Sequence, residues 1–259
     1  MKIFVTGNSH SACLIEAWKQ VQGSSPHQID FFVRGGSGVK DYRIDGTRIE
    51  AGNDDFRGYL ARLGLKDSFD LADYDARVVI GAEVSPFLMI AILNKCHVLG
   101  WPDPNRRGAQ EITERCLKAA LADGLRASNG GQMVAALQTL PGLGARPMLV
   151  VPQPFPSERL RTMTTAGAGF LRAIRGRIAP LAAAGFADVA SRTFADLGAR
   201  FLPQPEDTTV DFILTPEAFT SRAKRLIDLD KLQPKGDFLH ANAAFGARIL
   251  GQILDTLGA

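Results

Sequence analysis

Short apolar runs alternate with amphipathic segments along the chain. Four of the runs are rich in β-branched and aromatic residues and have the length of strands that are buried on both faces of a sheet. They are Lys2–Thr6, Gln28–Val33, Arg77–Gly81 and Pro147–Pro152, with a weaker fifth run at Ala199–Leu202. Because strands that alternate with helices form parallel sheets covered on both sides, the pattern predicts a three-layer α/β/α fold with a five-stranded parallel sheet.

Apolar residues at helical spacing lie between and after these runs, and they predict amphipathic helices. The sets are Leu14, Ile15, Trp18 and Val21 after the first run, Ile112, Cys116, Ala119 and Ala120 before the fourth, and Phe245, Ile249, Ile253 and Leu257 in a closing helix over 241–257. The apolar stretch Val84–Trp101 contains Pro86, Asn94, Lys95 and His97, which are costly in lipid. It therefore predicts a buried helix and no membrane span.

The length and composition fit one large domain. The chain has 259 residues, of which 46% are hydrophobic and 22% are charged, and no segment resembles a linker between domains. We expect a single domain over 1–259 with an insertion at about 40–71, where glycine, aspartate and arginine are mixed and the periodicity is patchy. Insertions of this kind often determine specificity, because loops vary while the sheet stays fixed.

Charge and cysteine content exclude several classes of partner. The formal net charge is only +3, and the basic residues are spread along the chain instead of forming the stripe typical of nucleic-acid binding. The densest basic stretch, Arg172, Arg175 and Arg177, is typical of the solvated face of a helix. Cys13, Cys96 and Cys116 have no metal-binding spacing and are expected to be buried, reduced thiols. We expect no metal, no cofactor and no nucleic-acid partner. Because the chain begins with a strand-like run where a secretory signal would stand, we also expect a cytoplasmic protein.

The first candidate for chemistry follows the first predicted strand, where the chain has the sequence Gly7-Asn8-Ser9-His10-Ser11. A serine at this position stands at the carboxyl edge of a parallel sheet and at the start of a helix. Unpaired N–H groups and the helix dipole favour developing negative charge there. Ser9 is therefore a candidate nucleophile, although a serine at the start of a helix is also a common cap.

The second candidate lies near the other end of the chain, in Gly236-Asp237-Phe238-Leu239-His240. An aspartate three residues before a histidine in a loop can fold back to accept a hydrogen bond from the ring Nδ1–H. The other ring nitrogen is then free to take a proton from a serine. Ser9, His240 and Asp237 together predict a catalytic triad. The alternatives are that Asp237 caps a helix and that His240 is a surface histidine.

These two segments resemble those of the SGNH (GDSL-like) hydrolase superfamily. The Gly7–Ser11 segment is similar to its GDSH-type first block, and Asp237 to His240 is similar to its closing DxxH block, with Asn242 and Phe245 similar to a common continuation. The resemblance implies a flavodoxin-like sheet, ester chemistry and an oxyanion hole. The resemblance implies that Ser9 and a glycine after the second strand supply the donors of the oxyanion hole. In the segment Gly35-Gly36-Ser37-Gly38, Gly38 is the first candidate for this glycine and Gly36 the second.

The third block departs from the family pattern. Glu83, in Gly81-Ala82-Glu83-Val84, stands where the family has an asparagine that donates to the oxyanion. An ionised glutamate only accepts hydrogen bonds, so it would repel an oxyanion. Either burial keeps Glu83 protonated, or another donor such as Asn53 reaches in from the insertion, or the protein is an impaired relative that binds ligands. Glu83 and Asn53 are thus predicted substrate-binding residues.

Three functions are compatible with the sequence. The first is a serine esterase that acts on a small-molecule or carbohydrate ester, the second is an O-acyltransferase with the same triad, and the third is a catalytically impaired binding or accessory protein. A dinucleotide-binding turn is disfavoured because Ser11, Ala12 and Cys13 stand where further glycines are needed. The GxSxG elbow of α/β-hydrolases and the HExxH motif of zinc enzymes are both absent from the sequence.

Overall fold

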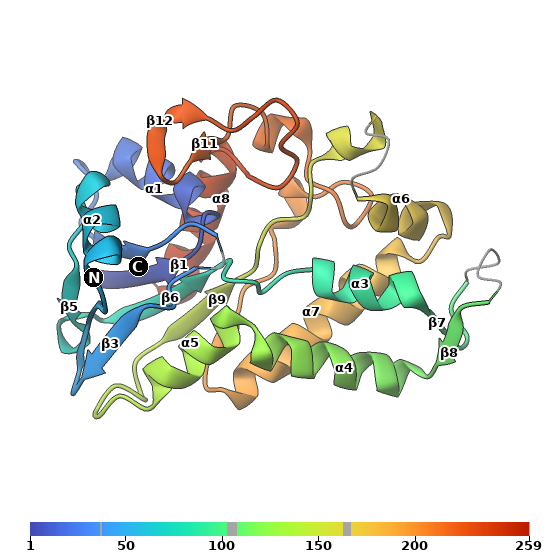
Figure 1. Ribbon diagram of the computed structural model, residues 1–259, viewed down its shortest axis with the longest axis horizontal. Coiled ribbons are helices and arrows are strands. Elements are labelled where there is room, and N and C mark those ends of the chain that lie inside the picture. Colours follow the sequence, from blue (N-terminus) through green and yellow to red (C-terminus); the bar gives the residue numbers. More distant parts are fainter. Residues whose placement is uncertain (37, 103–107, 163–166, 259) are drawn as a thin grey trace.

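The computed structural model describes residues 1–36, 38–102, 108–162 and 167–258. Its centre is a five-stranded, all-parallel sheet in the order β10-β9-β6-β1-β2 (Figure 1). The strands are β1 (Lys2–Gly7), β2 (Gln28–Val33), β6 (Ala76–Ile80), β9 (Met148–Val151) and β10 (Arg200–Phe201). The predicted α/β fold with a five-stranded parallel sheet is confirmed, and each strand lies within about a residue of its predicted run.

The order of the strands creates a switch point beside β1. Numbered by their appearance in the sheet, the strands lie in the order 2-1-3-4-5, so the chain leaves β1 in one direction to form β2 and then returns past β1 to form β6. Ligands of open α/β sheets bind at the carboxyl ends of the strands where this reversal occurs. The residues that follow β1 and β6 therefore occupy the favoured position for a site.

Helices cover both faces of the sheet. The helices α1 (Ser11–Val21) and α8 (Ala243–Leu257) pack on one face, against side chains such as Ile3 and Val5. The next residue in the pleat, Phe4, points to the opposite face, which α5 (Asn129–Gln138) and α7 (Ala179–Asp196) help to cover. Successive strand residues point to opposite faces, so β1 has apolar side chains at every position from Ile3 to Val5.

The insertion predicted at about 40–71 lies between β2 and β6, and it has regular structure. It forms a three-stranded antiparallel sheet with one helix, consisting of β3 (Tyr42–Asp45), β4 (Arg48–Ala51), α2 (Asp54–Arg62) and β5 (Ser68–Asp70). Ile49, Phe56 and Phe69 are buried and join the insertion to the main core. The sequence pattern missed these elements because strands of three or four residues are too short to show an alternation.

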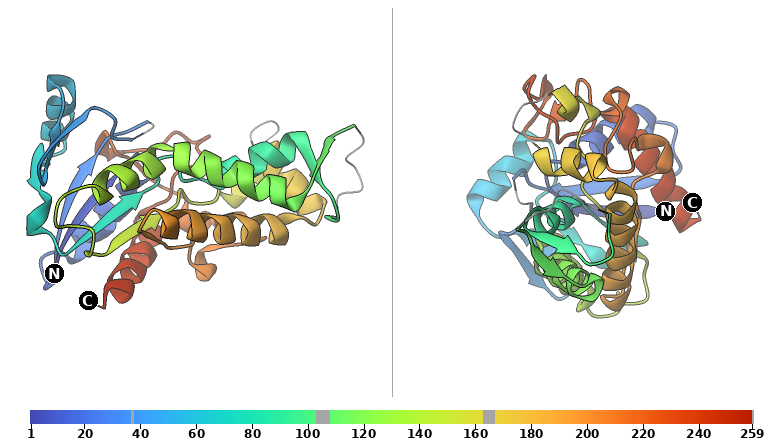
Figure 2. Two further views of the ribbon diagram at one scale, coloured as in Figure 1. Left: turned by 90° about the horizontal axis from the view of Figure 1, so that it is seen from below. Right: turned by 90° about the vertical axis from the view of Figure 1, so that its right-hand side faces the viewer.

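A helical extension projects beyond one end of the sheet (Figures 1 and 2). It contains the helices α3, α4, α6 and α7 and a two-stranded parallel pair. Apart from α7, the elements are α3 (Phe87–Lys95), β7 (Cys96–Val98), β8 (Gln110–Ile112), α4 (Glu114–Ala127) and α6 (Ala168–Arg175). The buried helix predicted over 84–101 is thus shorter than expected, and its last residues form β7.

Two predictions about side-chain burial are wrong. In α4 the buried face is Leu117, Leu121 and Leu125, whereas Cys116, Ala119 and Ala120 are exposed. The leucine stripe buries more apolar surface than the alanine stripe, so it faces the core. Of the cysteines, Cys13 is buried, Cys96 is half-buried and Cys116 is exposed, so only one of the three expected buried thiols is buried. Arg172 and Arg175 are exposed on α6, as predicted, whereas Arg177 is exposed but lies after the end of the helix.

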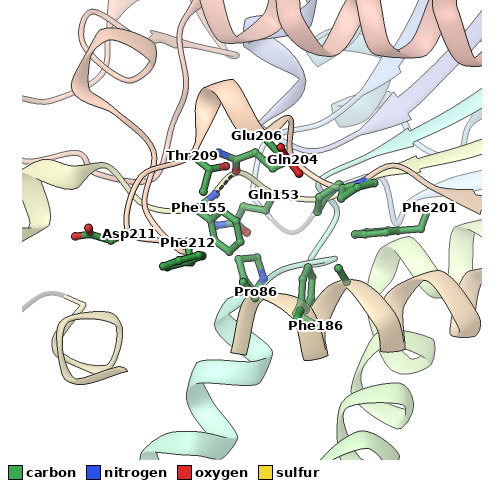
Figure 3. Close-up of a pocket in the computed structure, with 15 residues that line it drawn as sticks. Pro86, Gln153, Phe155, Phe186, Phe201, Gln204, Glu206, Thr209, Asp211 and Phe212 are labelled. Atoms are coloured by element: carbon green, nitrogen blue, oxygen red, sulfur yellow. Dashed lines mark hydrogen bonds between the residues drawn. The ribbon is translucent and has the colours of Figure 1, made fainter. Parts of the chain in front are cut away.

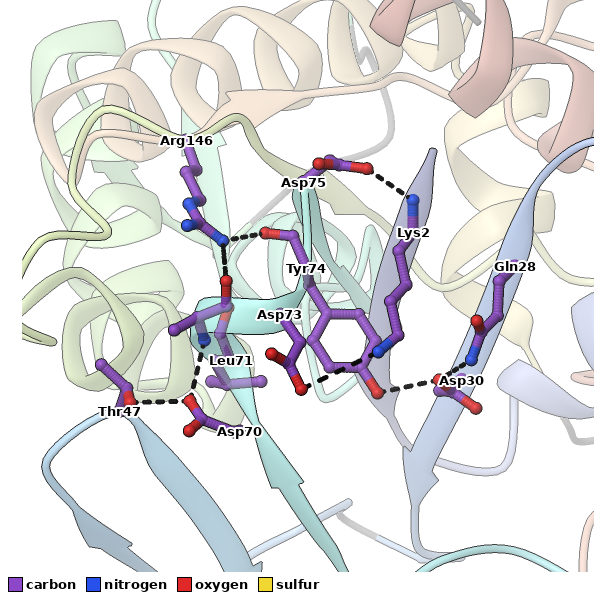
Figure 4. Close-up of polar contacts among 11 residues, drawn as sticks. Lys2, Gln28, Asp30, Thr47, Asp70, Leu71, Asp73, Tyr74, Asp75 and Arg146 are labelled. Atoms are coloured by element: carbon purple, nitrogen blue, oxygen red, sulfur yellow. Dashed lines mark hydrogen bonds and ion pairs between the residues drawn. The ribbon is translucent and has the colours of Figure 1, made fainter.

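The amino-terminal edge of the sheet is held by polar contacts (Figure 4). The Lys2 backbone N–H donates to Asp75 at 2.7 Å, and the Tyr74 hydroxyl donates to Asp30 at 2.8 Å. Nearby, the fully buried guanidinium of Arg77 donates to the carbonyl oxygens of Leu137 and Leu143, both at 2.7 Å. These contacts fix the edge opposite the candidate site.

The remaining elements connect β10 to α8 or lie in turns. They are the strands β11 (Lys224–Arg225) and β12 (Asp228–Leu232) and the short 3-10 helices Leu71–Asp73, Glu158–Thr162, Glu206–Thr208 and Glu217–Phe219. Among the helices in the described ranges, none has the length and apolar character required to cross a membrane.

Candidate active site

Ser9 lies at the switch point, in the turn between β1 and α1. The turn begins at Gly7, where a Cβ atom would lie 2.1 Å from the Ile80 carbonyl oxygen, so only glycine fits between β1 and β6. Asn8 is buried, and its side-chain oxygen accepts from the His10 backbone N–H at 3.2 Å. The Ser9 side chain makes no cap to α1. The capping alternative is therefore not what the structure shows, and the Ser9 hydroxyl has another partner.

That partner is His240. The Ser9 Oγ lies 2.9 Å from His240 Nε2, and His240 Nδ1 lies 2.9 Å from Asp237 Oδ1. The other carboxylate oxygen of Asp237 accepts from the His240 backbone N–H at 3.1 Å. The predicted contacts among the three residues are thus present. With Nδ1 protonated toward Asp237, Nε2 is the acceptor for the Ser9 proton.

Close packing of α8 on α1 brings the two ends of the chain together. A Cβ atom at Gly246 would lie 2.0 Å from the carbonyl oxygen of Cys13, so the absence of a side chain lets the helices touch. Asn242 caps α8 by accepting from Ala244 and Phe245, and its amide donates to the backbone of Ala218 and Ser221. The segment before α8, which carries Asp237 and His240, is therefore fixed over the start of α1.

The segment after β9 holds the Asp237 loop from the other side. The Ser157 backbone N–H donates to the Phe238 carbonyl oxygen at 2.8 Å. The guanidinium of Arg159 donates to the carbonyl oxygen of Asp237. These two bonds act on the backbone of the loop and leave the Asp237 carboxylate to His240.

The electrostatics of the loop favour an ionised Asp237. Burial by itself would raise the pKa of this carboxyl group, but the hydrogen bonds and the positive charge of His240 bring the pKa below its usual value. The side chains of Asp237 and His240 are 14% and 17% exposed, so water is largely excluded from their contact, whereas Ser9 is half-buried. A carboxylate in this position can orient the ring and stabilise the imidazolium that proton transfer creates.

His10 stacks on His240. The two rings are nearly parallel, with an interplanar angle of 20° and centroids 4.9 Å apart. Burial, reinforced by the neighbouring His240, lowers the pKa of His10 from 6.5 to about 3, while Asp237 and a hydrogen bond with the Gln153 side chain oppose the shift. His10 is therefore neutral at ordinary pH, and its ring supports His240 without adding a positive charge.

We expect His10 to make the protein less stable in mild acid. Below pH 6.5 the unfolded state binds a proton at His10, whereas the folded state binds it only near pH 3. The free energy of unfolding therefore decreases as the pH falls from 6.5 to about 3. The contribution of His10 to the loss is at most about 1.4 kcal/mol per pH unit. Urea unfolding at pH 8 and pH 5 measures it. His10→Phe, which keeps a ring but cannot titrate, is expected to lose less stability between these pH values than the wild type. Equal losses in the two proteins would contradict the assignment.

Gly38 and Gly36 differ in their surroundings. Gly38 is buried at φ +106°, and a Cβ atom there would lie 3.4 Å from Asn8 Cβ and 3.6 Å from Ala82 Cβ. Gly36 is exposed and has nothing within 4 Å of such an atom, and Ser37 lies outside the described residues. Gly38 thus lies beside the turn that carries Ser9, as its predicted role requires. Within the described residues, neither the Ser9 nor the Gly38 backbone N–H has a hydrogen-bond acceptor.

Glu83 lies at the carboxyl end of β6 in an unusual turn. Gly81, Ala82 and Glu83 all have positive φ angles, of 66°, 46° and 66°. Two consecutive non-glycine residues in this region are strained, and such strain is often found at functional sites. The carboxylate of Glu83 accepts from the Asn129 backbone N–H at 3.3 Å, at the start of α5. Glu83 is exposed, so burial gives no support to a protonated carboxyl group.

Asn53 has a structural role. It is the N-cap of α2, and its side-chain oxygen accepts from the Phe56 N–H at 2.9 Å. Within the described residues, no hydrogen bond joins its side chain to the Ser9 turn or to Glu83. The structure thus accounts for Asn53 as a helix cap and brings no donor from this residue to the candidate oxyanion site.

Sequence reasoning missed the residues that support the triad. His10 was part of the recognised segment, but nothing in its neighbours along the chain indicates that its ring stacks on His240. Gln153 and Arg159 lie in a proline-rich stretch after the fourth strand, where only their position at the carboxyl edge of the sheet gives a signal. No group of three or more metal-binding side chains occurs in the described part of the chain.

Comparison of the chain with models of protein families, with curated proteins and with solved structures finds no match.

Proposed function

We propose that this protein is a serine esterase of the SGNH type, in which Ser9 is the nucleophile, His240 the general base and Asp237 the residue that orients the ring. The observation that carries the proposal is the continuous hydrogen-bonded series from Ser9 Oγ through both ring nitrogens of His240 to Asp237, with 2.9 Å at each step. The three residues occur in the order and in the blocks typical of the superfamily. The 2-1-3-4-5 order of the strands agrees with a flavodoxin-like sheet.

In the proposed reaction, Ser9 Oγ attacks the ester carbonyl carbon while its proton moves to His240 Nε2. The carbonyl π electrons move to the oxygen, which becomes an oxyanion. When the oxyanion collapses, the bond to the leaving alcohol breaks, and the alcohol takes the proton from His240. Water then attacks the acyl-serine by the same steps and releases the acid and free Ser9. If a sugar hydroxyl replaces water, the same triad transfers the acyl group.

The oxyanion would be held by the backbone N–H groups of Ser9 and Gly38, which have no acceptor in the described residues. Glu83, after β6, has a carboxylate at the position where the family has an asparagine as the third hydrogen-bond donor. One missing donor typically lowers turnover about a hundredfold to a thousandfold. We therefore expect a slow esterase. The same observation favours the second candidate function, a binding protein on an esterase scaffold.

A fluorophosphonate probe tests the proposal directly. The probe reacts with serines whose hydroxyl is activated by a neighbouring base, so we expect one adduct per chain, located on Ser9 by peptide mapping. His240→Ala, which removes the base, is expected to slow labelling at least about a hundredfold. Intact mass without an adduct, or with an adduct on another residue, would refute an activated Ser9 and favour the binding function.

The charge of Glu83 is expected to limit the rate. Glu83→Gln keeps the size of the side chain, removes the negative charge and provides an N–H donor, so it should raise kcat for p-nitrophenyl butyrate about tenfold. Glu111→Gln, an exposed glutamate on β8, is the matched control and should leave kcat unchanged. Measured at equal protein stability, an unchanged or lower kcat in Glu83→Gln would show that the charge is not the impediment.

A further inference from the structure

A cavity of about 690 Å³ lies beyond the ends of β9 and β10, bounded on one side by α7 (Figure 3). Pro152 and Gln153 line it directly after β9, and Pro203 lines it shortly after β10. Ala183 and Ala187 contribute small side chains from α7, which leave the space open. Its volume is within the range of small-molecule sites in proteins, about 300–1,000 Å³.

The wall of the cavity is mainly apolar. Phe155, Phe186, Phe201 and Phe212 line it, and Figure 3 shows their rings around the space. The amide of Gln204 is used within the wall, because its oxygen accepts from the Phe155 N–H at 2.8 Å and its nitrogen donates to Thr208 and Thr215. These groups favour an apolar occupant.

The charged residues of the cavity exclude an anionic occupant. Asp211 and Glu206 line it, and no lysine, arginine or histidine is among its described lining residues. Asp211 is paired with Arg161, whereas Glu206 has no ion-pair partner within the described ranges. A carboxylate or phosphate inside the cavity would be repelled and would find no cation. Since phenylalanine, proline and alanine side chains make up most of the wall, the cavity best fits an uncharged apolar group.

The cavity and the triad lie along the same edge of the sheet. Gly7 of β1, Ile80 of β6 and Val151 of β9 are aligned across three neighbouring strands. Ser9 and Gln153 each lie two residues beyond this line. Since neighbouring strands are roughly 4.8 Å apart, the edge of the cavity at Gln153 is about 10 Å from the Ser9 backbone.

The segment after β9 connects the two places. The Gln153 side chain interacts with His10, whose ring stacks on His240, and Gln153 also lines the cavity. Two residues later Phe155 lines the cavity, and Ser157 and Arg159 then hold the backbone of the Asp237 loop. One continuous stretch, 152–159, thus forms part of the cavity wall and part of the support of the triad.

Phe212 is held at the cavity in a strained turn. The residue is 59% exposed, although its side chain is large and apolar. Asp211 and Phe212 have φ angles of 49° and 68°, a region that bulky residues rarely adopt. The bonds between Val210 and Leu214 and the ion pair of Asp211 with Arg161 fix the turn. An exposed phenylalanine fixed in this way offers a ring to an apolar ligand that fills the space beside it.

We propose that this cavity binds the acyl chain of the substrate, and that the substrate is an ester of an uncharged, long acyl group of about eight carbons or more. The proposal rests on the proposed esterase function and specifies its substrate class. An extended chain advances roughly 1.2 Å per bond, so about eight bonds span the distance from Ser9 to the cavity. Shorter acyl groups react at Ser9 without reaching it.

Chain-length dependence of ester hydrolysis tests the proposal. For p-nitrophenyl acetate, butyrate, octanoate, decanoate and dodecanoate in one co-solvent, we expect kcat/KM to rise beyond octanoate by about fourfold per methylene, which is the effect of burying one methylene group. Decanoate should exceed butyrate at least about tenfold. A flat or falling series beyond butyrate, with acetate hydrolysed, would overturn the acyl site and leave the esterase standing.

Filling the cavity should remove the preference for long acyl chains. Ala187→Trp places a large ring in the space and is expected to lower the decanoate-to-acetate ratio of kcat/KM at least about tenfold. The matched control is Ala195→Trp, the same change at an exposed position of α7 outside the cavity. Phe212→Ala at an exposed position keeps the core intact and should lower the ratio severalfold. A ratio that is unchanged in both Ala187→Trp and Phe212→Ala contradicts the proposal.

A direct binding measurement tests the cavity independently of ester hydrolysis. N-phenyl-1-naphthylamine is an uncharged apolar fluorophore, and we expect one saturable site per chain, lost in Ala187→Trp and kept in Ala195→Trp. If the fluorophore binds in this way but no ester is hydrolysed, the apolar site stands and the esterase function fails. If esters are hydrolysed but no saturable site is found, the assignment of the cavity fails.

Discussion

Replacing Ser9 with alanine is expected to lower kcat/KM for p-nitrophenyl butyrate at least about a thousandfold, to the rate of the uncatalysed reaction within error. The variant has no hydroxyl to attack the carbonyl carbon, and His240 then has no nucleophile to activate. Removal of a triad serine costs up to about a millionfold in efficient enzymes. A smaller loss is expected here, because we propose that the Glu83 carboxylate replaces an oxyanion donor and lowers the starting rate.

The control for this variant is Ser191→Ala, which removes an exposed hydroxyl from α7 and should retain full activity. Ser9 is only half-buried, and its hydroxyl bonds to the His240 ring alone among the described residues. We therefore expect the urea midpoint of Ser9→Ala to stay close to that of the wild type. Ester hydrolysis that persists at the wild-type rate in Ser9→Ala would exclude this residue as the nucleophile.

Asp237→Asn is expected to lower kcat/KM for the same ester about a thousandfold or more, although the shape of the side chain is retained. The amide can donate to His240 Nδ1, which would place the ring proton on Nε2, where a proton must instead be accepted from Ser9. The corresponding change in serine proteases costs about ten-thousandfold in kcat through this reversal. The oxygen of the substituted amide can still accept from the His240 backbone N–H, so the loop is expected to keep its conformation.

Asp45→Asn is a suitable control, because Asp45 is an exposed carboxylate at the end of β3. Steady-state kinetics at pH 7 to 9, together with urea unfolding, separate a chemical effect from a loss of fold. If Asp237→Asn keeps its stability and retains more than about a tenth of the wild-type kcat/KM, then the carboxylate does not orient His240 in the way that we propose.

The two large effects would come from residues at opposite ends of the chain, and their contact depends on positions that no local pattern reveals. The apolar spacing in 241–257 predicted α8, and the spacing after the first strand predicted α1. Neither pattern predicts how closely the two helices approach. The approach depends on Gly246, which packs against the Cys13 carbonyl oxygen without a side chain between them.

The sequence by itself determined the sheet and the identity of the candidate triad. Strand runs buried on both faces are uniformly apolar, so they can be predicted from the sequence without knowledge of their neighbours. The serine and the aspartate–histidine pair lie in short local motifs. The elements of the insertion and of the helical extension were harder to predict. Their strands have three or four residues, and the stripe of α4 that faces inward was decided by which side chains bury more surface.

Only the tertiary structure decided what surrounds the triad. The stacking of His10 on His240, the bonds from Ser157 and Arg159 to the Asp237 loop, and the contact of Glu83 with the start of α5 all join residues that are distant in sequence. The apolar cavity is formed by side chains from the segment after β9, from β10, from α7 and from the turn at Phe212. Such sites depend on the relative positions of whole elements, and these positions are set by packing across the core, which one-dimensional periodicity does not encode.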